Sequence, residues 1–260
     1  HLHPNAVRAL WKTIRDIDGQ KLIATHSGDL LSEVDIHSIR RLYKVAGDVR
    51  VGNIPRGTLD DHQLQKFDYF VIRNRGELFF ARVWLLVEGE TDVIILSGAA
   101  RILGIELEQA AVRIVDYAQS DLNMFIKAAD SLGIYWHVFS DGDPQGIKNI
   151  KKSRESLAGR TEQLHLTLLP NNEPIEPYLC RAGFIDVYEE HASDQNRPRY
   201  ITVGKEDDAY VMQLCQCLPN NGKPAAAHTV VVAMNERGKN SVPNEVSECL
   251  IKVLKLAAGV

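Results

Sequence analysis

The sequence lacks any apolar run that approaches the roughly 18 residues needed for a membrane-spanning helix. Its beginning, His1-Leu2-His3-Pro4, also lacks the basic and apolar zones of a secretory signal peptide. We therefore expect a soluble protein of the cytoplasm that has no contact with a membrane. Because the chain begins without methionine, inside what resembles a motif, we also expect it to be part of a longer protein.

The sequence also has little cysteine and no excess of positive charge. The four cysteines include no CxxC pair and have no zinc-ribbon spacing, so neither a disulfide framework nor a structural zinc is expected. They are Cys180, Cys215, Cys217 and Cys249. The formal net charge is -4 at pH 7. A chain with this balance does not attract nucleic acid over its whole surface, so any such contact must be local.

What is present is a regular alternation of apolar runs and helical patterns after residue 80. The apolar runs cover residues 83–87, 112–117, 134–139 and 164–169, and helical periodicity covers 91–103 and 121–132. This order predicts βαβ crossovers and a parallel, doubly wound sheet. Further helical patterns follow at 207–218, 224–237 and 244–257. The predicted fold class is α/β, with a parallel sheet flanked by helices and an additional C-terminal helical subdomain.

The region before residue 80 has a weaker pattern. Residues 5–18 have helical spacing, and the strand-like run 21–24 leads into Thr25-His26-Ser27. Glycine and proline interrupt residues 43–74, which predicts an irregular connection and a domain boundary near residue 80.

Carboxylates follow three of the predicted strands. Glu88 and Asp92 come after the first strand, with Gly89 expected to permit the turn between them. Asp141 and Asp143 come after the third strand, and Glu176 follows the fourth. Ligands of open parallel sheets bind beyond the carboxyl ends of the strands, so we expect these five side chains to meet at one edge.

Five clustered carboxylates repel one another unless a cation lies among them. Oxygen ligands of this kind suit Mg²⁺ or Mn²⁺, and two such ions support in-line hydrolysis of a phosphodiester. Ordinary structural interpretations stay open. Asp143 before Pro144 is also typical of a helix N-cap, and Asp92 is also favoured in a first helical turn by the helix dipole.

The motifs of residues 83–178 resemble those of the Toprim domain, the topoisomerase-primase fold. In that family a glutamate follows the first strand and a DxD follows the third, which Leu85-Leu86-Val87-Glu88-Gly89 and Val138-Phe139-Ser140-Asp141-Gly142-Asp143 match. The fold implied is a Rossmann-like parallel sheet. The metal ligands implied by the resemblance are Glu88, Asp92, Asp141, Asp143 and Glu176, with aspartate at position 92 where glutamate is common.

The N-terminal segments are similar to the end of an ABC-type ATPase domain. His1-Leu2-His3-Pro4 matches the residues after a Walker B acid, and His26 matches the switch histidine. The chain has no GxxxxGK[ST] loop, so we expect ATP to act only in a full-length protein. This combination resembles the C-terminal region of an OLD (overcoming lysogenization defect) family nuclease. The family also has a lysine near the metals, late in its sequence, and Lys239 is the candidate for it here. The resemblance thus implies three catalytic residues, Glu88, Asp141 and Lys239.

The resemblance divides the chain into five predicted parts. They are a remnant of the ATPase domain (1–50), an irregular connection (51–80), the Toprim catalytic domain (81–178), a helical insertion (179–222) and C-terminal helices that complete the site (223–260).

A local excess of basic residues follows the DxD motif and predicts contact with nucleic-acid phosphates. The candidates are Lys148, Lys151, Lys152 and Arg154. A solvated helix face is the alternative for these residues, and His137 and His165, inside apolar strands, are interpreted as core residues.

The leading hypothesis is a two-metal, Mg²⁺- or Mn²⁺-dependent endonuclease of DNA, linked to an ATPase portion that this chain does not contain. RNA as substrate and a homodimer stay open. The alternatives are a metal-stabilised module that binds nucleic acid or oligomerises without turnover, and another Toprim enzyme of the primase or topoisomerase type.

Overall fold

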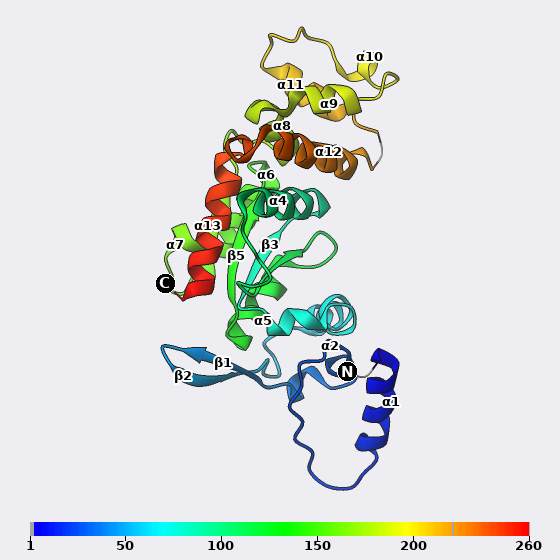
Figure 1. Ribbon diagram of the computed structural model, residues 1–260, viewed down its shortest axis with the longest axis vertical. Coiled ribbons are helices and arrows are strands. Elements are labelled where there is room, and N and C mark those ends of the chain that lie inside the picture. The colour runs from blue at the N-terminus through cyan, green and yellow to red at the C-terminus, as the bar shows by residue number, and fades with distance from the viewer. Residues whose placement is uncertain (1–2, 220, 260) are drawn as a thin grey trace.

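A four-stranded parallel sheet lies at the centre of the computed structural model, which describes residues 3–219 and 221–259 (Figure 1). Its strands are β3 (Val83–Val87), β4 (Val112–Asp116), β5 (Tyr135–Ser140) and β6 (Leu166–Leu168), in the order β4-β3-β5-β6. All residues of β3 are buried, as expected for a parallel strand in a sheet covered on both faces. The predicted α/β fold with a parallel sheet is confirmed.

The two faces of the sheet pack against different sets of helices. Val83, Leu85 and Val87 join a core with α4 (Glu90–Leu103), α12 (Gly222–Arg237) and α13 (Asn244–Ala258). Trp84 and Leu86 point to the other core, which contains α3 (Asp61–Phe67), α5 (Leu122–Leu132) and part of α6 (Pro144–Glu155). This alternation follows from the two-residue period of a strand. Helices α4 and α12 lie side by side (Figure 1).

Only helices follow β6 in the described part of the chain. They are α8 (Ile175–Leu179), a π-helical segment (Cys180–Phe184), α9 (Ile185–His191), α10 (Arg197–Tyr200), α11 (Ala209–Gln216), α12, a 3₁₀ turn (Lys239–Ser241) and α13. The three helices predicted in this region are therefore confirmed as α11, α12 and α13. Helices α9 to α11 form one end of the elongated molecule (Figure 1).

The N-terminal region contains short elements at the opposite end of the molecule (Figure 1). They are α1 (Pro4–Arg15), α2 (Gly28–Leu31), a 3₁₀ turn (Ile36–Ser38), the antiparallel hairpin of β1 (Arg41–Val45) and β2 (Asp48–Gly52), α3, a π-helical segment (Asp68–Arg73) and a 3₁₀ segment (Gly76–Phe80). Residues 51–80, predicted as an irregular connection, contain the end of β2 and several short helical segments. The division of the chain near residue 80 stays a prediction. Gly52, interpreted as a break, instead permits close contact, because a Cβ there would lie 2.4 Å from the Leu132 carbonyl oxygen.

Two strand predictions need correction. Residues 21–24 form no strand, and the Leu22 side chain is 99% exposed, because no described segment lies beside them to complete a ladder. The run 164–169 begins instead with the helical turn α7 (Glu162–His165), and the strand is limited to Leu166–Leu168. Within α7 the buried His165 ring lies 2.6 Å from the Trp136 carbonyl oxygen.

The buried His137 ring lies 2.8 Å from the Leu164 carbonyl oxygen and 2.9 Å from the Thr167 hydroxyl. Both histidines are thus core residues, as interpreted. Among the described helices, none is both long and apolar enough to cross a membrane.

Candidate functional site

The acidic side chains from separate strands gather at the carboxyl edge of the sheet. In the register, Leu86 pairs with Val138 and Ser140 pairs with Leu168, so β3, β5 and β6 end close together. Glu88 directly follows β3 and Asp141 directly follows β5. Along the chain, β4 is added on one side of β3 and β5 on the other, so the strand order reverses between β3 and β5. The Glu88 and Asp141 carboxylates therefore lie at the topological switch point of the sheet.

The two carboxylate oxygens of Asp92 differ, because one has a hydrogen-bond partner and the other has none among the described residues. It lies in the first turn of α4, only 4% exposed, where its Oδ2 accepts a hydrogen bond of 2.9 Å from the Gly89 N–H. Its Oδ1 is buried without a hydrogen-bond partner among the described residues. Burial raises the pKa of Asp92 to about 7, with further contributions from Glu176 and Glu88.

Glu88 and Asp141 also contain buried oxygens without partners. Glu88 Oε2 and Asp141 Oδ1 have no hydrogen-bond partner in the described part of the protein. Burial, followed by repulsion from Asp92, Glu176 and the remaining acids, raises the pKa of Asp141 to about 8. Burial and then Asp143 raise the pKa of Glu88. The cluster therefore holds its negative charge at a substantial cost in free energy.

Asp143 serves as the N-cap of α6. Its Oδ1 accepts a hydrogen bond of 2.7 Å from the Gly146 N–H, and Pro144 occupies the first turn. The N-cap interpretation is thus confirmed for this oxygen. Asp143 still lies close enough to raise the pKa values of Asp141 and Glu88.

Glu176 brings a lysine into the site that the sequence interpretation missed. Glu176 is 3% exposed at the start of α8, and its Oε1 lies 3.1 Å from Lys223 Nζ, at the start of α12. Burial alone would lower the pKa of Lys223, but the Glu176 and Asp141 carboxylates outweigh it and raise the pKa. One sequence signal was available: a cation in the first turn of a helix is unfavourable unless acids compensate for the helix dipole.

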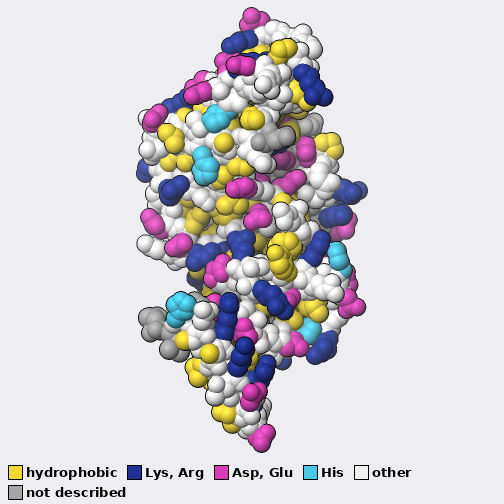
Figure 2. All heavy atoms as spheres, turned by 90° about the vertical axis from the view of Figure 1, so that its right-hand side faces the viewer, with side chains coloured by type: hydrophobic (Ala, Val, Ile, Leu, Met, Phe, Trp, Pro, Cys, Tyr) yellow, Lys and Arg dark blue, Asp and Glu magenta, His cyan; other side chains and the backbone are white. Residues whose placement is uncertain are grey.

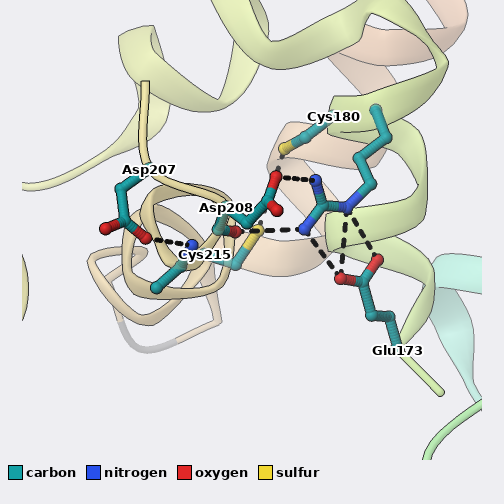
Figure 3. A network of polar contacts seen from close by, with 7 residues as sticks. Glu173, Cys180, Asp207, Asp208 and Cys215 are labelled. Atoms are coloured by element: carbon teal, nitrogen blue, oxygen red, sulfur yellow. Dashed lines mark hydrogen bonds and ion pairs between the residues drawn. The ribbon is translucent and has the colours of Figure 1, made fainter. Parts of the chain in front are cut away.

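The loop that carries Glu176 is anchored to the DxD segment. The Gly142 N–H donates to the Glu173 carbonyl oxygen at 2.9 Å. The buried Glu173 carboxylate accepts two hydrogen bonds from Arg181 Nε, at 3.0 and 3.1 Å, and one from its Nη2 at 2.9 Å (Figure 3). The Arg181 guanidinium also donates to the Asp208 carbonyl oxygen, which joins the loop to the segment before α11. These bonds fix the position of Glu176 relative to Asp141.

The two motif glycines have different roles, which predicts different effects of alanine. A Cβ on Gly142 would lie 2.5 Å from the Leu169 carbonyl oxygen, so Gly142→Ala is expected to lower the melting temperature by several degrees. At Gly89 the backbone is extended and no atom lies within 4 Å of an added Cβ, so the expectation that a glycine is needed there for the turn is wrong. Gly89→Ala should therefore melt within about 2 °C of the wild type. Equal melting temperatures in a thermal scan of both variants would contradict this assignment.

The comparisons with known proteins agree with the fold of the domain that contains the acidic cluster. Residues 79–143 match the family model described as the overcoming lysogenization defect protein-like TOPRIM domain. The chain contains an OLD-like Toprim domain. Residues 1–77 match a family described only as a protein of unknown function, DUF2813, so the interpretation of this segment as an ATPase remnant stays a prediction.

Solved structures with the same fold come from OLD proteins. The C-terminal region of the Burkholderia pseudomallei OLD protein is 18% identical, with a TM-score of 0.50 over 68% of this chain and 99% of that one. The C-terminal region of the Xanthomonas campestris pv. campestris OLD protein is 16% identical, with a TM-score of 0.52 over 70% and 96%. The uncharacterized protein YbjD of Escherichia coli (strain K12) is 30% identical over 99% of this chain. The chain spans 46% of YbjD.

The donor set of the OLD-like Toprim site fits a hard divalent cation. Three buried carboxylate oxygens lack partners, and bound cations are the usual explanation for such groups. Within residues 3–219 and 221–259, however, no three His, Cys, Asp or Glu side chains are arranged as a formed metal site. Rotation of the side chains is therefore required before one ion could contact several of them.

Lys239 does not lie with the acids of the OLD-like Toprim domain. Its Nζ donates to the Leu103 carbonyl oxygen at 3.3 Å, at the C-terminal end of α4. Asp92 lies at the other end of this helix, roughly 16 Å away at 1.5 Å per residue. The structure thus gathers the five acids and Lys223, and separates Lys239 from them.

The basic candidates beside the OLD-like Toprim site are exposed on α6. Lys148, Lys151 and Lys152 face solvent, whereas Arg154 forms a bidentate ion pair with Glu162 at 2.6 and 2.8 Å. Figure 2 shows acidic and basic side chains intermixed on the coloured part of one face, without a continuous basic surface there. Contact with a polyanion on that face would therefore be local, as the net charge suggested.

His26 lies far along the chain from this site, in an exposed position before α2. Its ring centroid is 6.1 Å from that of Phe80. Its assignment as the switch histidine of an ATPase stays a prediction.

Proposed function

We propose that this chain provides the catalytic site of an Mg²⁺- or Mn²⁺-dependent nuclease that hydrolyses DNA phosphodiester bonds. The observation that carries the proposal is the convergence of Glu88, Asp92 and Asp141, each with a buried carboxylate oxygen that has no partner among the described residues. Asp143 and Glu176 complete the proposed ligand set, because their charges act on the same cluster. RNA stays open as an alternative substrate.

The protein residues would supply position and charge. Glu88, Asp92 and Asp141 would hold two cations against a phosphate, and two cations of this class can activate water and neutralise a leaving oxygen. Lys223 would hold Glu176 in place and present an ammonium group to the phosphate. Lys148, Lys151 and Lys152 would neutralise flanking phosphates without reading sequence, whereas Arg154 is already paired with Glu162.

The remaining parts of the proposal concern a longer protein. We infer that residues 1–50 complete an ABC-type ATPase domain, with His26 as its switch residue, and that residues 81–178 and 223–260 together form the nuclease site. The contact between Lys223 and Glu176 supports the second inference, since it joins these two ranges. Location in the cytoplasm and assembly as a homodimer belong to the same proposal.

A cleavage assay tests the proposed nuclease. Purified protein should nick supercoiled plasmid in the presence of Mg²⁺ or Mn²⁺, and the addition of a chelator should stop the reaction. Glu88→Gln should slow the reaction at least about tenfold, because it removes one charge from the cluster. Glu90→Gln is the matched control, since Glu90 is an exposed acid two positions away.

Cleavage that persists in the chelator, or that is equal in Glu88→Gln and Glu90→Gln, would overturn the proposal. A wild-type protein that binds DNA but does not cleave it with any tested metal would instead be a binding module, because the acids then serve only to hold cations.

A further inference from the structure

A cavity of about 380 Å³ opens beside the acidic cluster, between the loop after β4 and helices α5 and α6. We call it the α5–α6 pocket. Its lining includes Glu88, Tyr117, Ser120, Asn123, Asn149 and Lys152. Glu88 therefore belongs both to the carboxylate cluster and to the wall of this pocket. Cavities that hold small ligands measure about 300–1,000 Å³, so the pocket has room for one such group.

The lining offers hydrogen-bond donors and acceptors rather than a set of like charges. Asn149 is buried, donates to the Tyr117 hydroxyl at 3.3 Å and accepts from Gln145 Nε2 at 2.9 Å. Asn123 and Ser120 add an exposed amide and a hydroxyl. Side chains of these types match the edges of a nucleobase and the hydroxyl groups of a sugar.

The charged residues of the lining also suit a nucleotide, because one of them offers a positive charge to a phosphate. Asp121 is already occupied, because its Oδ1 accepts from the Asn123 N–H at 2.9 Å and its Oδ2 accepts from Gln63 Nε2 at 2.8 Å. Glu88 also belongs to the acidic cluster, whose other carboxylates raise its pKa. Lys152 is then the lining residue whose positive charge is available to a phosphate.

We propose that the α5–α6 pocket holds the nucleoside next to the phosphate that the acidic cluster handles, and that this nucleotide must be unpaired. The inference rests on the proposed function, because it places the substrate phosphate at the carboxylates. A base within a duplex is stacked and paired, and its removal from the helix costs free energy. The protein should therefore act most readily on single strands, frayed ends or distorted duplexes.

Three oligonucleotides of one sequence test the proposal: a single strand, a blunt duplex and a duplex with an unpaired end. With Mg²⁺ or Mn²⁺, the wild type should cleave the single strand and the unpaired end at least about tenfold faster than the blunt duplex, because the duplex must first open a base pair. Equal rates on all three substrates would overturn the requirement for an unpaired nucleotide.

Variants that fill the pocket separate it from the metal cluster. Ser120→Trp places a large ring in the lining, whereas Gln119→Trp adds the same ring at an exposed neighbour outside it. We expect Ser120→Trp to lower single-strand cleavage at least about tenfold and Gln119→Trp to leave it within about twofold. Equal rates for the two variants would overturn the pocket.

A second pair of variants tests the pocket without a bulky side chain, so the result does not depend on the folding of the tryptophan variant. Lys152 lines the pocket and Lys151, beside it on α6, does not, although both are exposed. Binding of a fluorescent single-stranded 12-mer, measured in chelator, should weaken about threefold more in Lys152→Ala than in Lys151→Ala. Equal weakening would count against the pocket.

The two assays distinguish the failure of each proposal. If the wild type cleaves and the Ser120→Trp variant is indistinguishable from it, the pocket is wrong and the nuclease assignment stands. If the wild type cleaves no substrate but Ser120→Trp still weakens binding of the 12-mer, the pocket is supported and the nuclease assignment is wrong.

Discussion

Lys223→Ala is expected to lower metal-dependent cleavage by about 100-fold or more, which is the usual effect of losing one group that stabilises transition-state charge. The Lys223 ammonium lies 3.1 Å from Glu176 Oε1 and near Asp141. Its removal leaves the buried Glu176 carboxylate without its cation and takes a positive charge away from the phosphate site. Initial rates of plasmid nicking at saturating metal measure the effect.

Lys239→Ala is the matched control for this prediction. Lys239 is an exposed lysine bonded to the Leu103 carbonyl at the far end of α4, so its loss should leave cleavage within about twofold of the wild type. Lys223→Arg should retain more activity than Lys223→Ala, because it keeps the charge beside Glu176. If Lys239→Ala were the inactive variant, Lys239 would be the lysine that the family resemblance implies, and the assignment of Lys223 from the geometry would be wrong.

A purely structural role for Lys223 would give a different pattern. Loss of the ion pair alone would lower the melting temperature and leave the rate per folded molecule unchanged. The predicted result is a fall in kcat for protein that is folded at the assay temperature, so thermal melting of both variants belongs to the same experiment.

The sequence predicts the acidic cluster because strand patterns and loop positions are local properties. The apolar runs 83–87 and 134–139 form most of β3 and β5, and these strands end directly before Glu88 and Asp141. Parallel strands bring such ends to one edge of the sheet. The N-cap role of Asp143 was also available from its position before Pro144.

Other features depend on contacts that periodicity does not encode. Lys223 reaches Glu176 because α12 packs beside α4 and begins near α8, and these helices are far apart in the sequence. The hairpin of β1 and β2 was missed because Gly47 and Gly52 were interpreted as breaks. Gly47 instead adopts a positive φ in the turn, while Gly52 contacts Leu132. The run 21–24 illustrates the opposite error, since a strand pattern needs a neighbouring strand.

Asp141→Asn is expected to abolish cleavage and, at the same time, to stabilise the metal-free protein. Burial and the surrounding carboxylates raise the pKa of Asp141 to about 8 from its usual 3.8. Between these two values the folded protein holds a proton that the unfolded chain has released. The stability of the wild type in chelator should therefore fall as pH rises from about 4 to about 8, and this part of its pH dependence should shrink in the variant.

The measurement is the melting temperature in chelator and in Mg²⁺ or Mn²⁺, at several pH values. At pH 8 in chelator, Asp141→Asn should melt about 3 °C or more above the wild type, because the amide removes one repelled charge. Added metal should raise the melting temperature of the wild type and have little effect on the variant, since ligand binding stabilises only a protein that retains the site. Asp48→Asn, in the exposed hairpin, should respond to metal as the wild type does. An Asp141→Asn variant that melts below the wild type in chelator, yet gains as much from metal, would mean that the carboxylates at this edge of the sheet do not form a cation site.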